Sequence, residues 1–310
     1  MPATPDLPRP EGPLPSPSPD APAERPLVAV GWMVLTGLLF VGVTAVVKHL
    51  GDRIPAPQSA FLRYLLGLVF LIPMWPALRA ARLTAGGWGL FTLRGAFHSV
   101  GVMLWFYGMT RITIAEVTAM NYMTPVYVTL GAALFMGERL RARRIAAVFA
   151  AMAGALVILR PGVRELDPGH LAMLFCAVFF AGSYLLAKRL SAQATAPVVV
   201  GLLSIMVTVA LAPVAWTVWV PPTLAELGWL MLVAGFATGG HYTMTLAFRA
   251  GPLSVTQPVT FLQLVWAVTL GAVVFAEPVD LWVIAGGAAI LGAVSFIALR
   301  EAQIARRAAG

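Results

Sequence analysis

VTLGAALF at residues 128–135 recurs as VTLGAVVF at residues 268–275, and a glutamate, Glu138 or Glu277, follows each copy closely. The similarity extends over residues 108–140 and 247–281, with a one-residue slip near the end. A match of this length at a fixed offset indicates an internal duplication, so the chain consists of two related halves.

Apolar stretches long enough to cross a bilayer fill the sequence from residue 27 onward. Hydrophobic residues make up 59% of the chain and charged residues 11%, with a mean hydropathy of +0.85. A spanning helix needs about 20 apolar residues. We therefore predict an all-α integral membrane protein with ten transmembrane helices. The predicted spans cover residues 27–47, 57–76, 87–109, 112–136, 144–160, 170–187, 197–220, 224–248, 253–275 and 281–299.

Five spans in each half is an odd number, so the second half enters the membrane in the opposite orientation. The predicted domains are two inverted five-helix repeats, at residues 27–160 and 170–300. A proline-rich tail at 1–26, expected to be disordered, precedes them, and a short tail at 301–310 follows. Inverted repeats can exchange their shapes and so open a central site to either side of the membrane.

The net charge of +8 reflects membrane orientation and does not indicate a nucleic-acid partner. Fifteen of the 21 Lys and Arg residues were assigned to one set of alternate loops, Arg94 among them, and five to the other; Arg63 lies within a span. Under the positive-inside rule, both termini are cytoplasmic in a multi-pass inner-membrane protein. Membrane lipid is then a partner, notably of the basic residues 139–144.

Several motifs together resemble the EamA group of the drug/metabolite transporter superfamily. They are FLRYLLG (61–67), ITIAE (112–116), NYMTPVYVTLGAALFMGERL (121–140) and AEPV (276–279). The resemblance covers residues 27–300 and is closest to transporters of riboflavin, S-adenosylmethionine and amino-acid-like metabolites. It implies a ten-helix fold whose central cavity is lined mainly by spans three, four, eight and nine. The motifs leave the substrate open.

Ionisable residues inside a span are costly and are candidates for function. Arg63 and Glu116 lie one to two turns from the outer ends of spans two and four. Their similar depth predicts an Arg63–Glu116 ion pair, either a static link between spans or an outer gate or coupling group.

His98 in span three and His241 in span eight lie near mid-membrane in corresponding helices. Each is a candidate either for the substrate cavity or for a hydrogen bond that tethers neighbouring helices. Because histidine titrates near physiological pH, a role in proton coupling is a further option.

Polar and aromatic side chains in the central spans are the remaining substrate-binding candidates. Pro125 frees the backbone carbonyl of Asn121, which predicts a kink in span four. Polar side chains at such a kink can contact a ligand, or they can hydrogen-bond another helix. The full set is Asn121, Tyr122, Thr124, Tyr107, Tyr242, Gln263 and Trp266.

These features favour a secondary transporter that moves a small polar or zwitterionic organic metabolite by alternating access. The sequence has no phosphate-binding GxxxxGK[ST] motif, no metal-ligand spacing and no catalytic constellation, so we expect neither an enzyme nor a cofactor. The alternative is a non-transporting membrane receptor or assembly scaffold. The direction of transport, the coupling ion and the oligomeric state stay open, a homodimer included.

Overall fold

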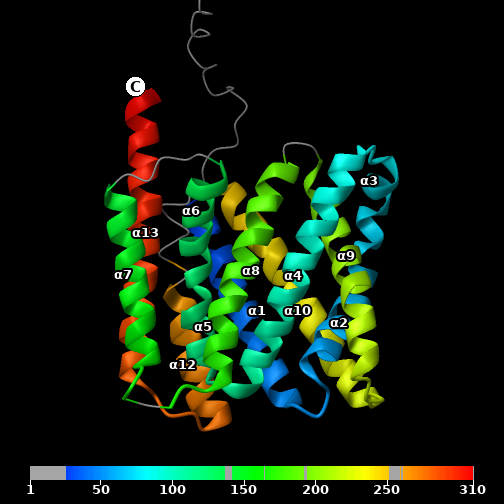
Figure 1. Ribbon diagram of the computed structural model, residues 1–310, viewed down its shortest axis with the longest axis horizontal. Helices are drawn as coiled ribbons and strands as arrows, with labels where there is room; N and C mark the ends of the chain where they lie inside the picture. The colour runs from blue at the N-terminus through cyan, green and yellow to red at the C-terminus, as the bar shows by residue number, and fades with distance from the viewer. Residues whose placement is uncertain are drawn as a thin grey trace, which may run out of the picture.

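The computed structural model describes residues 26–136, 142–163, 165–191, 194–250, 259 and 261–309. Long helices lie side by side in a single bundle (Figure 1), and the described part of the chain contains no β-strand. Residues 1–25 of the predicted tail at 1–26, and the GERL motif with Glu138, fall outside these residues; Pro26 is the first residue of α1.

Every predicted span coincides with helix in the described residues. Two spans are broken into shorter elements, and α13 continues as one helix through the segment predicted as a C-terminal tail. The helices are α1 (Pro26–Leu50), α2 (Ala56–Gly67), η1 (Leu68–Met74), α3 (Trp75–Ala80), α4 (Ala85–Arg111), α5 (Ile114–Asn121), α6 (Met123–Met136), α7 (Ala142–Leu159), α8 (Pro168–Ser191), α9 (Ala196–Thr217), α10 (Leu224–Ala250), α12 (Phe261–Phe275) and α13 (Leu281–Ala309).

Proline accounts for both broken spans. Pro73 lies within the 3₁₀ segment η1, between α2 and α3. In span four, α5 ends at Asn121 and α6 begins at Met123. The prediction of a kink before Pro125 is therefore confirmed.

Four helical stretches among the described residues are long and apolar enough to cross a membrane. They are Leu27–Leu50, Ala56–Ala80, Pro168–Ala187 and Pro197–Thr217. The apolar parts of α7, α12 and α13 are shorter, at 10–17 residues. The all-helical membrane architecture agrees with the prediction, whereas the inversion of the two halves stays a prediction.

The two halves pack through corresponding helices. α1 packs against α10, and α4 packs against α8, so the first helix of each half contacts the third helix of the other. The fifth helices, α7 and α13, pack together, as do the segments α2 and α9. This pattern is the one expected of two repeats related by an approximate two-fold axis.

The loops that follow α1, α7, α9 and α12 lie at one end of the bundle, the lower end in Figure 1, and these loops and the adjoining helix ends are rich in acidic residues. We call it the acidic end; it holds Asp52, Glu116, Glu165, Asp167, Glu226, Glu277 and Asp280. The ion pairs that join described residues lie here: Lys48–Glu277, Arg53–Glu226, Arg160–Asp280 and His170–Glu116.

Two of these pairs join the halves through the loops between helices. In one, the Glu226 carboxylate accepts hydrogen bonds from Arg53, and this contact raises the pKa of the exposed guanidinium. In the other, Arg160 after α7 reaches Asp280 before α13. Both contacts hold the ends of helices that also pack along their length.

Facing glycines bring the α7 and α13 backbones into contact. A Cβ added to Gly154 would lie 2.7 Å from the carbonyl oxygen of Gly286, and one added to Gly286 would lie 2.5 Å from that of Gly154. Such distances exclude any side chain unless a backbone shifts. Small residues of this kind let membrane helices approach closely.

Gly286→Ala is therefore expected to destabilise the protein by about 1–3 kcal/mol, the usual effect of overpacking a close contact. The matched control is Gly292→Ala on the same helix, where an added Cβ meets nothing within 4 Å. Apparent melting temperatures of the purified variants in detergent measure the effect. Equal melting temperatures for the two variants would show that this contact does not limit helix approach.

Candidate substrate-binding site

His98 links three helices at the centre of the bundle. It lies midway along α4, 92% of its surface is buried, and its ring is hydrogen-bonded on both sides. Nε2 is 2.8 Å from the Tyr64 hydroxyl of α2, and Nδ1 is 3.2 Å from the Ser183 hydroxyl of α8. Of the two roles left open for His98, the helix tether is the one with geometry behind it.

Two buried arginines flank this histidine. Arg63 immediately precedes Tyr64 in α2, and its guanidinium carbon lies 4.0 Å from the centroid of the Tyr64 ring. Arg94 lies one helical turn before His98 on α4, and its Nη1 donates to the Val199 carbonyl of α9 at 2.9 Å. Arg63 and Arg94 expose only 8% and 6% of their surfaces.

The prediction that places Arg94 among the loop residues is wrong. α4 begins at Ala85, so Arg94 is nine residues into the helix and buried. The predicted span 87–109 already contained this position. Its presence inside an apolar stretch was the signal that should have made it a site candidate.

The predicted Arg63–Glu116 ion pair does not form. The Glu116 carboxylate accepts hydrogen bonds from the backbone and hydroxyl of Thr113, at 2.9 and 3.0 Å, in a capping box at the start of α5. Its other oxygen is 3.2 Å from Nε2 of the buried His170 on α8. His170 is the third residue of α8, whereas Ser183, which bonds His98 at the level of Tyr64 and Arg63, lies 13 residues or about 20 Å further along that helix. Glu116 and Arg63 therefore lie at different depths, and the premise of the predicted pair was wrong.

Polar atoms without a partner surround the break between α5 and α6. The Asn121 side-chain oxygen and the Thr124 hydroxyl are buried, and neither has a hydrogen-bond partner in the part of the chain that the structure describes. Between them, Tyr122 is hydrogen-bonded to the backbone of Leu264 in α12. The break thus brings together Asn121, Tyr122 and Thr124 and leaves two of them with unused hydrogen-bonding capacity.

α12 and α4 each contribute an indole N–H group that also lacks a partner among the described residues. The Trp266 and Trp105 Nε1 atoms are buried without an acceptor. Trp266 packs near Val41 of α1 and Ile114 of α5. Gln263, one turn before Trp266, backs against Gly37 of α1, whose added Cβ would lie 3.5 Å from its own.

Aromatic rings of α8 lie beside His98 of α4. Phe180 lies 5.0 Å from the His98 ring and 6.4 Å from the Trp105 ring. Tyr184 is stacked on Phe180, with 17° between the ring planes, and 44% of it is exposed. Together these rings offer flat apolar surface beside the central polar groups.

The remaining predicted residues lie further from this centre or are more exposed. Tyr107 lies near the end of α4, with the Arg111 guanidinium 5.1 Å from its ring centroid. Tyr242 is 63% exposed. His241 of α10 packs edge-on against Phe40 of α1 and lies within electrostatic reach of Arg63 and Arg94.

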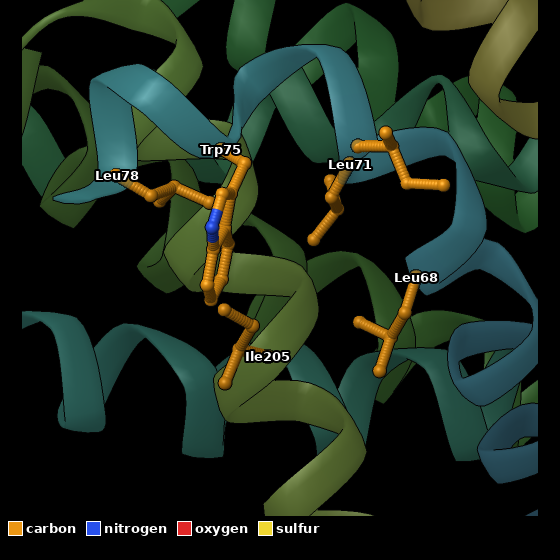
Figure 2. Close-up of a pocket in the computed structure, with 6 residues that line it drawn as sticks. Leu68, Leu71, Trp75, Leu78 and Ile205 are labelled. Atoms are coloured by element: carbon orange, nitrogen blue, oxygen red, sulfur yellow. The ribbon is translucent and has the colours of Figure 1, made fainter.

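A separate pocket of about 370 Å³ lies between η1, α3 and α9. Its lining is apolar, and Figure 2 shows Trp75 and Ile205 facing each other across it. None of the predicted site residues lines it. The Trp75 indole is the one side chain with a polar atom among the residues that line it, so we keep the pocket apart from the candidate site.

The model of the EamA-like transporter family matches the chain twice, at residues 27–160 and 167–299. A riboflavin transporter of Rhizobium johnstonii is 31% identical, with 92% of this chain and 95% of that protein aligned. The pseudopaline exporter CntI of Pseudomonas aeruginosa is 28% identical over 87% and 95%. An S-adenosylmethionine uptake transporter of Rickettsia bellii is 23% identical over 88% and 94%.

One solved crystal structure resembles this one with a TM-score of 0.58, at 21% sequence identity. The alignment covers 88% of this chain and 97% of the other. At this identity the likeness concerns the fold alone.

Tyr64→Phe should lower the free energy of unfolding by about 1–3 kcal/mol, because it leaves the buried Nε2 of His98 without its partner. Tyr242→Phe is the control, since that residue is exposed and should tolerate the loss of its hydroxyl. Melting temperatures of both variants in the same detergent test this expectation. A fall of equal size in the two would contradict the tether.

Proposed function

The chain belongs to the EamA-like transporter family, and from that premise we propose that it is a secondary transporter of a small polar organic metabolite. The aligned relatives are named for the transport of riboflavin, pseudopaline and S-adenosylmethionine, and each aligns over nearly its whole length. These solutes share moderate size and several polar groups. The proposal therefore assigns to this chain the class of small polar organic metabolites and no single solute.

The observation that carries the proposal is the set of buried polar atoms without partners at the centre of the bundle. Asn121, Thr124, Trp105 and Trp266 supply two acceptor-capable oxygens and two indole donors. Polar groups of this kind are costly in hydrocarbon unless something satisfies them. A polar solute bound between α4, the α5–α6 break and α12 would do so.

Alternating access is the proposed mechanism. The cross-half packing of α1 with α10 and of α4 with α8 supports two repeats that rock against each other. The break at Tyr122 supports it too, since discontinuous helices commonly build transporter sites near the midplane. In this proposal Glu116 contributes to alternating access through its ion pair with His170 on α8, in place of the predicted pair with Arg63.

A contact at the acidic end is the proposed outer gate. Glu277, after α12, accepts a hydrogen bond from the Ile114 backbone at 3.0 Å and pairs with Lys48 at the end of α1. Lys48 also donates to the Ile112 carbonyl at 2.9 Å. These contacts join α1, α12 and the start of α5, so the site can open at this end only if they break.

Transport itself is testable with the purified protein in proteoliposomes. We expect counterflow of one solute from a panel of riboflavin, S-adenosylmethionine, amino acids and nucleosides. Asn121→Ala and Gln263→Ala should each reduce that flux by about tenfold, since one lost hydrogen bond to a bound polar group corresponds to about 1.4 kcal/mol. Tyr242→Phe should leave it unchanged.

Binding without flux in the same vesicles would contradict the transporter and favour the receptor or scaffold alternative. Flux unchanged by both alanine variants would contradict the location of the site while leaving transport intact.

The proposed gate predicts a local effect of Glu277→Gln. Loss of the charge weakens the hydrogen bond to Ile114, and a bond to a charged group contributes about 1.5–3 kcal/mol. Hydrogen exchange of the peptide that covers 113–121 should therefore accelerate by about tenfold or more. Asp280→Asn, which removes the acid paired with Arg160, is the control and should leave this peptide protected.

A further inference from the structure

We propose that Arg63 and Arg94, on either side of the Tyr64–His98 hydrogen bond, form a subsite for an anionic group of the substrate, a carboxylate or a phosphate. The inference rests on the proposed function, because it names a feature of the metabolite that this transporter would carry. None of the predicted sites included Arg94, and Arg63 was predicted to pair with Glu116.

The two arginines are deep in the bundle. Thirteen residues of α4 lie on each side of His98, so about 20 Å of helix extends in both directions from it. The Tyr64 hydroxyl contacts His98 directly, which brings α2 and the adjoining Arg63 to the same level. Arg94 lies one turn away on α4, about 6 Å along the axis.

No carboxylate neutralises them among the side chains that the structure describes. The seven acids at the acidic end lie in loops or at helix ends, and their ion pairs are with Lys48, Arg53, Arg160 and His170. The other titratable neighbours of the two arginines are His98, His241, Tyr64 and Tyr184, and none of them is a carboxylate. Two guanidinium charges therefore lie within electrostatic reach of His98, and no described carboxylate pairs with either of them.

Much of their hydrogen-bonding capacity is unused. The Nε of Arg63 and that of Arg94 are buried without an acceptor. Arg94 gives one Nη1 bond to Val199, and Arg63 contacts the face of the Tyr64 ring. Each guanidinium has five N–H donors in a fixed fork that matches carboxylate and phosphate oxygens. These arginines are positioned by their neighbours and are still available to an anion.

The aromatic surface beside the two arginines further restricts the class of ligand that would fit. Phe180 and Tyr184 present stacked rings next to His98, and Tyr184 is partly exposed and within electrostatic reach of Arg94. A planar ring could lie against them while its anionic group reaches the arginines. An organic anion with an aromatic ring fits both features, and flavin mononucleotide is a probe with this chemistry.

Riboflavin and flavin mononucleotide provide a matched pair that differs only by a phosphate group. Titration of the purified full-length protein, followed by quenching of flavin fluorescence, measures both affinities. We expect flavin mononucleotide to bind at least tenfold more tightly than riboflavin. Arg63→Gln and Arg94→Gln should each remove this preference, whereas Arg82→Gln, at an exposed position after α3, should retain it.

Thermal unfolding provides a readout that needs neither flavin binding nor transport. Sodium phosphate should raise the melting temperature of the wild-type protein above its value in sodium chloride of equal ionic strength. The increase should be lost in Arg63→Gln and Arg94→Gln and kept in Arg82→Gln. Arg63→Lys should keep part of it, because it retains the charge and loses the fork.

Equal affinity for the two flavins, or a preference that survives in both glutamine variants, would overturn the subsite. So would phosphate stabilisation that persists in both variants, since the ion would then bind elsewhere, or the absence of any stabilisation. Arginine-dependent phosphate stabilisation in a protein that moves no solute would support the subsite and count against the transporter.

Discussion

Hydrocarbon offers no hydrogen bonds, so each polar group inside this bundle must be satisfied by another part of the protein or by a ligand. The His98 imidazole meets this constraint by bonding Tyr64 on one side and Ser183 on the other, which ties α2, α4 and α8 together. The Glu116 carboxylate meets it through Thr113 and His170. Among the described residues, most of the buried polar atoms that do not meet it belong to the candidate site, at Asn121, Thr124, Trp105, Trp266, Arg63 and Arg94; those of Arg160, Glu277 and Ser295 lie outside it.

The described bundle contains two contrasting groups of charged residues, the paired charges at the acidic end and the unpaired arginines near His98. At the acidic end, opposite charges meet in pairs that close loops and hold the start of α5. Halfway along α4, positive charge stands without a negative partner in the described part of the bundle. A static protein has no use for that imbalance in the middle of a bilayer, whereas a carrier whose cargo brings the missing charge does.

Length and hydropathy were enough to predict the helices, because a bilayer imposes one length on every span. The break at Tyr122 was predictable as well, since proline cannot donate a backbone hydrogen bond. Side-chain pairing was not. Glu116 lies at the acidic end and Arg63 at the level of His98, so the two residues do not share the depth that the predicted pair required. The T-x-x-E spacing of Thr113 and Glu116 was the better signal, because it predicts a capping box. Arg94 was overlooked because it was counted as topology although it lay inside a predicted span.

The facing glycines of α7 and α13 have a mechanical consequence. Most helix pairs interlock through side-chain ridges and grooves, so they shift only by jumping from one register to the next. Where Gly154 meets Gly286, backbone rests on backbone, and the side chains that flank the contact are those of Ile158 and Ile290. Since this pair holds the fifth helix of each half, it is suited to act as a pivot, a bearing that stays in contact while the rest of the two halves tilts around it.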